Sequence, residues 1–160
     1  MYDLLGNDLK KSDCFLAFLP LAHILEFVVE ITLSFYGMTI GYGRIKTLTD
    51  ASVRNCLGDF RAFRPTIMVG VSAVWENIRK GIIGKVNESG ALRKGVFNVA
   101  LSIKRANIPL LKNIVDSIVF SQAREQTGGR LRLALSGGSA ISPDTQEFLS
   151  LVLVKVLQGR

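Results

Sequence analysis

The sequence predicts an α/β fold, with a largely parallel sheet flanked by helices. Short apolar runs of strand length alternate along the chain with longer segments whose apolar residues have helical spacing. The runs are hydrophobic almost throughout, which is typical of strands buried on both faces of a parallel sheet. The composition agrees with one globular domain, because 48% of the 160 residues are hydrophobic and 21% are charged.

Four of the apolar runs are expected to be strands. Glycine, proline or polar residues bound each run, and such residues interrupt a strand. In the last run, leucines alternate with arginine and alanine, so the leucines share one face. The expected strands cover residues 15–21, 38–42, 66–71 and 131–135.

The first helix is expected over residues 23–36. Glu26 and Glu30 lie four positions apart, so they share a helix face, which we interpret as the polar one. Gly37 fits the C-terminal stop of this helix. Each carboxylate would cost roughly 2.5–3.5 kcal/mol near the centre of a bilayer. The apolar stretch 15–42 is therefore interpreted as a strand, a turn and an amphipathic helix, not as a membrane span.

Two helices are expected on either side of the third strand. The first covers residues 53–63, with Thr49 or Asp50 as its cap and Pro65 at its end. The second is capped by Ser72 and buries an apolar stripe on one face. The stripe consists of Val74, Ile78, Ile82 and Val86.

The last third of the chain is expected to add three more helices. Residues 91–106 and 110–125 have helical periodicity, and a diglycine turn at 128–129 leads into the fourth strand. Ser142 as N-cap, with Pro143 at the first helical position, opens the final helix.

The charge pattern does not favour nucleic acid. The formal net charge is +7, but the basic residues are scattered, and no aromatic residues are interleaved as a stacking platform requires. We interpret these charges as solvated helix faces. Cys14 and Cys56 have no CxxC spacing, and the chain has one histidine, so a zinc site is not expected. Both cysteines are interpreted as reduced core thiols.

Ligands of open α/β sheets bind beyond the carboxyl ends of the strands. The loops after Leu21, Val71 and Leu135 are therefore the expected site. The loop at 136–141 is the most informative, because its two glycines allow the backbone to approach a flat or anionic ligand close to the start of a helix. The alternative is an ordinary strand-to-helix turn.

Two further side chains are candidates. His23 follows the first strand and is interpreted either as a wall of the ligand pocket or as a hydrogen-bonded structural histidine. Trp75 lies one position off the stripe of its helix, and it is interpreted either as a core residue or as the lining of an apolar channel.

Four ordered segments together resemble the eukaryotic, especially fungal, long-chain fatty acyl-CoA synthetases. They are FLAFLPLAHILE at 15–26, IGYGRIKTLTD at 40–50, FRPTIMVGVSAVWENIRKGI at 63–82 and LRLALSGGSAISPDTQEFL at 131–149. That family activates a fatty acid with ATP and Mg²⁺ to an acyl-adenylate and transfers the acyl group to coenzyme A. The resemblance implies cofactor binding by Gly137, Gly138, Ser139 and Ala140, and substrate binding by His23 and Trp75.

The departures from the family pattern concern missing segments. The phosphate loop, the YGLTE segment with its magnesium-holding glutamate, and the C-terminal domain are absent from residues 1–160. Ser72 stands where the family usually has proline, and Arg160 where it has tyrosine. The resemblance thus implies a piece of one AMP-binding domain, which we expect to be inactive alone because it lacks donors for phosphate charge.

The setting expected from the resemblance is intracellular. It implies peripheral association with the cytoplasmic face of membranes such as the endoplasmic reticulum or lipid droplets, and no nucleic-acid partner. The alternative hypothesis is a non-catalytic, truncated module that associates with lipid or membrane.

Overall fold

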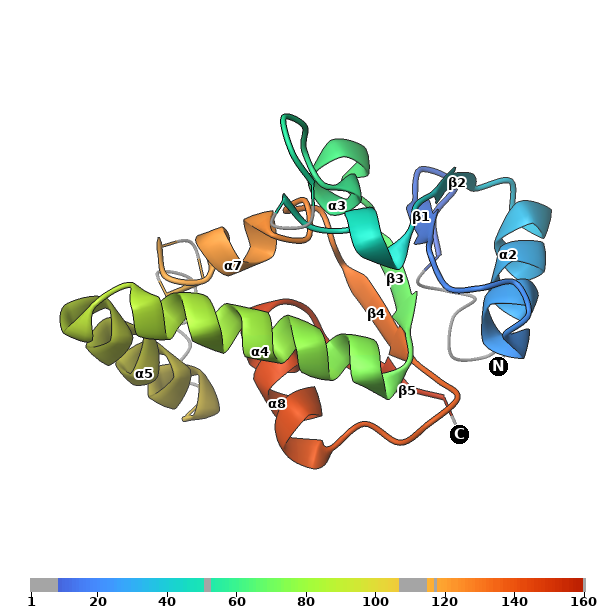
Figure 1. Ribbon diagram of the computed structural model, residues 1–160. Coiled ribbons are helices and arrows are strands. Elements are labelled where there is room, and N and C mark those ends of the chain that lie inside the picture. Colours follow the sequence, from blue (N-terminus) through green and yellow to red (C-terminus); the bar gives the residue numbers. More distant parts are fainter. Residues whose placement is uncertain (1–8, 51–52, 107–114, 117, 160) are drawn as a thin grey trace.

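The computed structural model describes residues 9–50, 53–106, 115–116 and 118–159. They form a five-stranded sheet in which every strand pair is parallel, in the order β2-β1-β3-β4-β5 (Figure 1). The expected α/β class is confirmed. The strands are β1 (Cys14–Ala17), β2 (Thr39–Tyr42), β3 (Ile67–Gly70), β4 (Leu133–Ser136) and β5 (Val156–Gln158).

Helices cover both faces of the sheet (Figure 1). α2 packs on one face through Val29 and Leu33, whereas α4 and α8 cover the other, and α5 packs against α4 and α8. Alternation along each strand explains the two cores, since Met68 contributes to one and Val69 to the other. The helices are α2 (Ile24–Phe35), the 3₁₀ helix η1 (Ile45–Thr47), α3 (Asp59–Phe63), α4 (Ser72–Glu88), α5 (Ala91–Arg105), α7 (Ser121–Glu125) and α8 (Pro143–Val152).

The expected helix over 53–63 is largely wrong. Only α3 is helical, because the Asp50 carboxylate accepts a hydrogen bond from the Gly58 backbone N–H at 2.7 Å and thereby holds the preceding segment in bends. Asn55, at φ +60°, lies in the left-handed region. Cys56 is exposed on this segment rather than buried in a core.

The C-terminal elements follow the expectation more closely. α5 matches the helix expected over 91–106, and Ser142 caps α8 by accepting from the Thr145 backbone N–H. The helix expected over 110–125 lies partly outside the described residues, and α7 begins only after a break at Val119 and Phe120. The short strand β5 was not expected.

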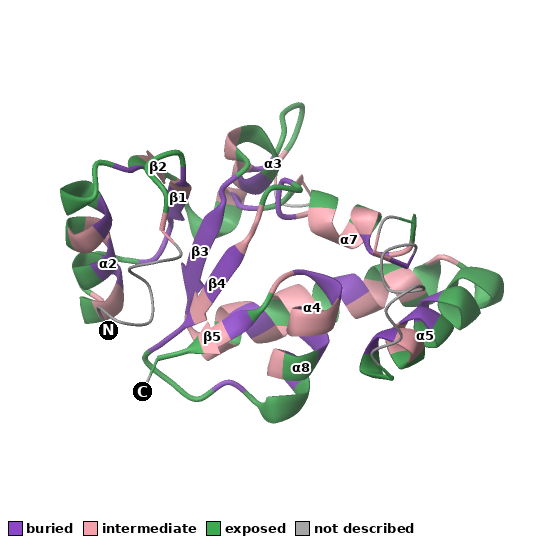
Figure 2. Cartoon of the chain, turned by 180° about the vertical axis from the view of Figure 1, so that it is seen from behind, coloured by how far each residue is buried: buried purple, intermediate pink, exposed green. Residues whose placement is uncertain are grey.

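The orientation of α2 is opposite to the expectation. Glu26 is fully buried, beside the backbone of Phe18 and Leu19. The exposed side of α2, green in Figure 2, includes apolar residues such as Phe35, which is 91% exposed. Amphipathic periodicity identifies a face that differs from the other, but it does not say which face the fold covers. In the part of the chain that the structure describes, no helix is long and apolar enough to cross a membrane.

An ion pair fastens the amino-terminal edge of the sheet. Asp13, which is 2% exposed, accepts hydrogen bonds from Arg132 Nε at 2.7 Å and from Thr66 Oγ1 at 2.8 Å. The residues precede β1, β4 and β3, so one carboxylate ties three strands together. The hydrogen bond from Arg132 is the main reason why the pKa of Asp13 falls to about 2.

Candidate functional site

The loops after β1, β3 and β4 converge at the carboxyl edge of the sheet, as expected. β1 and β4 are separated by β3, yet His23 and Gly138 are in contact. A Cβ atom added to Gly138 would lie 3.0 Å from His23 Cε1 and 3.7 Å from Val71 Cγ1. The structure thus brings together two residues that the sequence analysis selected from distant segments.

The glycines of the loop are required by space and by conformation. Gly138 has φ +78°, a conformation that L side chains rarely adopt. A Cβ atom on Gly137 would lie 2.9 Å from Leu25 Cδ1, so a side chain there would force the Leu25 side chain on the first turn of α2 to move. The loop therefore presents bare backbone at the sheet edge, which suits close approach of a ligand.

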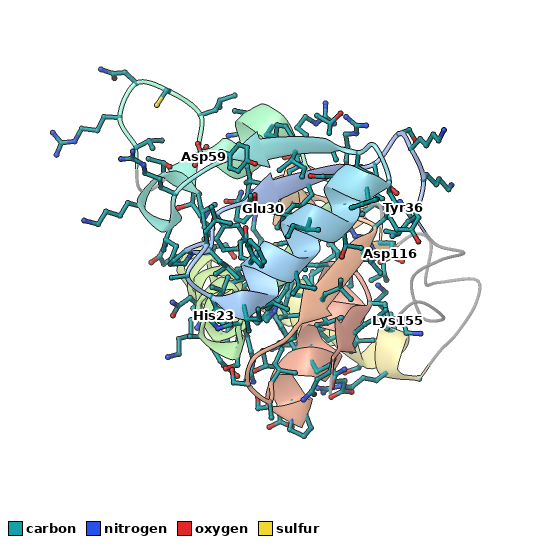
Figure 3. The ribbon with its side chains drawn as sticks, turned by 90° about the vertical axis from the view of Figure 1, so that its right-hand side faces the viewer. His23, Glu30, Tyr36, Asp59, Asp116 and Lys155 are labelled. Carbon is teal, nitrogen blue, oxygen red and sulfur yellow. The ribbon has the colours of Figure 1, made fainter. Side chains whose placement is uncertain are left out.

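His23 is held in place by its own helix. It is the N-cap of α2, and its Nδ1 accepts a hydrogen bond from the Leu25 backbone N–H at 3.3 Å. Figure 3 shows His23 at the first turn of α2, at the end of the helix away from Tyr36. The remaining imidazole nitrogen, Nε2, lies on the side of Gly138, so the half-buried ring faces the loop.

Two serine contacts connect the loop to α4. Ser139 Oγ lies 2.7 Å from Ser72 Oγ, and Ser142 Oγ donates to Glu76 Oε1 at 3.0 Å. Ser72 was expected to cap α4, but Val71 is the N-cap, and the Ser72 hydroxyl bonds across to the loop instead. Ala140 is exposed.

Trp75 lies in the core rather than off the inner stripe of α4. Its side chain is 0% exposed, and its indole N–H donates to the Gly70 carbonyl at 3.1 Å. A Cβ atom on Gly70 would lie 3.2 Å from the indole, which explains a glycine at the end of β3. This burial favours the core interpretation, while a role in substrate binding stays a prediction.

Two buried polar groups near this edge have no partner. Ser136 Oγ, at the end of β4, has none among the described residues. Burial raises the pKa of Glu26 to about 7, and the Glu30 carboxylate adds to the rise. The backbone N–H groups of Leu19 and Phe18 lower the pKa of Glu26 by a smaller amount. Neither carboxylate oxygen completes a hydrogen bond within the described residues.

Sequence reasoning missed Leu25 and Glu26 as parts of this edge, and it included Ser136 only as the start of the loop at 136–141. Leu25 and Glu26 follow His23 in the same segment, so proximity to a candidate residue was the available signal. No pattern indicates that Ser136 lacks a partner, because this depends on how α4 and α8 pack. Within the described ranges, no three His, Cys, Asp or Glu side chains are grouped to hold a metal ion.

Solved structures of low sequence identity share this fold. The adenylation domain of a carboxylate reductase from Mycobacterium chelonae superposes with a TM-score of 0.63 at 19% identity, over 92% of this chain and 20% of that one. The N-terminal domain of FACL13 from Mycobacterium tuberculosis, bound to an inhibitor, gives 0.56 at 15% identity, over 96% of this chain and 27% of that one.

Sequence relatives are much closer. The chain is 51% identical to long-chain-fatty-acid–CoA ligase 1 of Schizosaccharomyces pombe over 157 residues, which are 95% of this chain and 23% of that protein. It is 50% identical to a palmitoyl-CoA ligase of Gibberella moniliformis, over 90% of this chain and 22% of that protein. The chain thus spans less than a quarter of these relatives. A family model described as AMP-binding enzyme matches residues 2–159, and the chain belongs to this family.

Proposed function

We propose that the chain forms part of an enzyme that activates long-chain fatty acids to acyl-CoA through an acyl-adenylate. The contact between His23 and the glycine loop at 137–140 carries this proposal, because it builds a bare-backbone edge where the sheet fold places ligands. The relatives named as long-chain fatty acid and palmitoyl ligases support the substrate class.

In this proposal, Gly137 and Gly138 accommodate ATP at the edge of the sheet. Their missing Cβ atoms let Leu25 and His23 pack directly on the loop and leave its backbone bare, and Ser139 offers a hydroxyl that Ser72 orients. His23 forms the opposite wall and faces the acyl carboxylate. ATP supplies the adenylyl group that makes this carboxylate reactive.

In this proposal, Trp75 contributes to the acyl site from the core, where it packs at the end of β3. Its indole fixes the end of β3, from which Val71 and Ser72 lead into the site. We assign no described residue to Mg²⁺ or coenzyme A, because the described part contains no metal-binding cluster. Both remain expectations that follow from the family.

The exposed apolar faces favour a second candidate, a non-catalytic module that associates with lipid. Ile24 on α2 is 69% exposed, and Leu92 on α5 is 88% exposed, in a chain of net charge +7. Such surfaces bind partners or membranes, and a basic chain is attracted to anionic lipid. Peripheral attachment to a cytoplasmic membrane face is compatible with both candidates.

A chimaera separates the two candidates. The aligned segment of the Schizosaccharomyces pombe ligase is replaced by this chain, and palmitate-dependent ATP–pyrophosphate exchange is measured. The catalytic proposal predicts exchange by the chimaera and none by the chain alone. A folded chimaera without exchange, together with binding of the chain to anionic vesicles, would favour the lipid module.

A further inference from the structure

A second concave site lies at the opposite edge of the sheet from the glycine loop. It is a pocket of about 560 Å³, a size in the range of small-molecule sites. Its lining includes Arg61 on α3, Arg64 just before β3, and Arg124 on α7. α3 and α7 lie at the amino-terminal end of β3 and β4 (Figure 1), so the pocket does not overlap the edge formed by His23 and Gly138.

The three arginines retain hydrogen-bond donors. Arg64 uses Nε to donate to the Gly128 carbonyl at 2.9 Å, and its terminal amino groups have no partner among the described residues. Arg124 donates through Nη2 to Asp116 at 2.8 Å, but its buried Nε has no partner in the described part of the chain. Arg61 bonds Asp50 through one Nη only. A guanidinium offers five N–H donors, so most remain free.

The charge of the pocket favours an anion. Asp116 and Glu125 are the acidic residues in the lining, against three arginines. Asp116 is already neutralised from two sides, because Lys104 Nζ lies 2.5 Å from the oxygen that Arg124 contacts. Forked guanidinium groups match the geometry of phosphate oxygens.

We propose that this pocket binds a small phosphate-bearing anion. Arg64 and Arg124 would donate to the phosphate oxygens from two sides of the pocket, and Arg61 would close it from α3. The site is independent of the proposed catalytic edge, and the proposal commits to a soluble ligand, with binding to phosphate-bearing lipid as the contrary outcome of the test.

Calorimetric titration of the full chain with inorganic pyrophosphate tests this site. We expect saturable binding that Arg64→Gln and Arg124→Gln each weaken by at least about tenfold, since a hydrogen bond to a charged group is worth about 1.5–3 kcal/mol. Arg93→Gln on α5 removes the same charge from an exposed position and should leave the affinity unchanged.

Thermal unfolding of each variant shows whether the substitution has disrupted the fold. If Arg64→Gln unfolds, Arg64→Lys is used instead. Its affinity for pyrophosphate should be weaker than that of the parent but still measurable, because lysine keeps the positive charge and loses the forked donor geometry. Absence of saturable binding, equal weakening by Arg93→Gln, or preference for vesicles containing phosphatidic acid over pyrophosphate would overturn the proposal.

Discussion

The two edges of the sheet differ in whether their buried carboxylates have hydrogen-bond partners. At the amino-terminal edge, Asp13 is buried, but Arg132, Thr66 and the Lys10 backbone satisfy it. At the carboxyl edge, Glu26 and Ser136 are buried without partners among the described residues, and the glycines leave the loop backbone bare. Satisfied polar groups stabilise a fold, whereas unsatisfied ones are retained at functional sites. The difference indicates that the Asp13 cluster holds three strands together, whereas the loops at the carboxyl edge suit a ligand; the arginine pocket at the amino-terminal edge is separate from the Asp13 cluster.

Trp75 lies beneath the carboxyl edge and should still behave as a core residue. We expect Trp75→Ala to reduce the free energy of unfolding by about 4 kcal/mol, because it leaves a cavity and an unpaired Gly70 carbonyl. Urea unfolding measures this change. Near-parent stability, together with altered preference between short and long fatty acids in the chimaera, would instead place Trp75 in an acyl channel.

The amino-terminal ion pair should contribute the next largest effect. Asp13→Asn should lower the free energy of unfolding by about 3 kcal/mol, since it leaves Arg132 without its charged partner. Glu147→Gln breaks the exposed pair with Arg105 and should cost less than about 1 kcal/mol. Similar losses in both variants would contradict the role given to this edge.

The same ion pair should make stability depend on acid. The pKa of Asp13 is about 2 in the fold, against an ordinary value of 3.8. A depressed pKa stabilises the fold above the unfolded value, and this contribution is lost as pH falls from about 4 to 2. Asp13→Asn should remove this part of the acid transition, as followed by circular dichroism.

Glu26 should give a smaller effect of opposite sign. Its pKa in the fold is about 7, against 4.5, so its contribution is full below pH 4.5 and is lost as pH rises through 7. Glu26→Gln should therefore be more stable than the parent at pH 8 by about 2 kcal/mol, but not at pH 4. Glu30→Gln, one turn later, is the matched control: it keeps Glu26 and should retain most of the parent's pH dependence, reduced by the loss of the Glu30 charge. A parent whose stability does not fall between pH 5 and 8 would contradict the unpaired state of Glu26.

Much of the fold was accessible from the sequence, because apolar runs and caps are local signals. The parallel sheet, the Ser142 cap and the converging loops were predicted correctly. The failure at Glu26 has a physical cause: periodicity gives helix faces but not which of them the sheet buries. The segment before Gly58 has helical spacing, yet the Asp50 side chain competes for the backbone N–H that would start the helix earlier.

The candidate site could be predicted only in part. The glycine loop and His23 were identified from motifs, and the structure explains why they meet, since each follows a strand at the same edge. The basic pocket left no sequence signal, because Arg61, Arg64 and Arg124 come from separate segments that only the packing of α3 and α7 brings together.

The most direct test of the central claim is the glycine loop itself. In the chimaera, Gly138→Val should lower kcat/KM for ATP by at least about tenfold, since small displacements of a binding group are costly to catalysis. Gly90→Val is the matched control, because Gly90 also has positive φ but nothing lies within 4 Å of its Cβ position. A selective loss in Gly138→Val, with Gly90→Val near the parent, is the predicted result. Equal kcat/KM in the two variants would contradict ligand binding at the carboxyl edge.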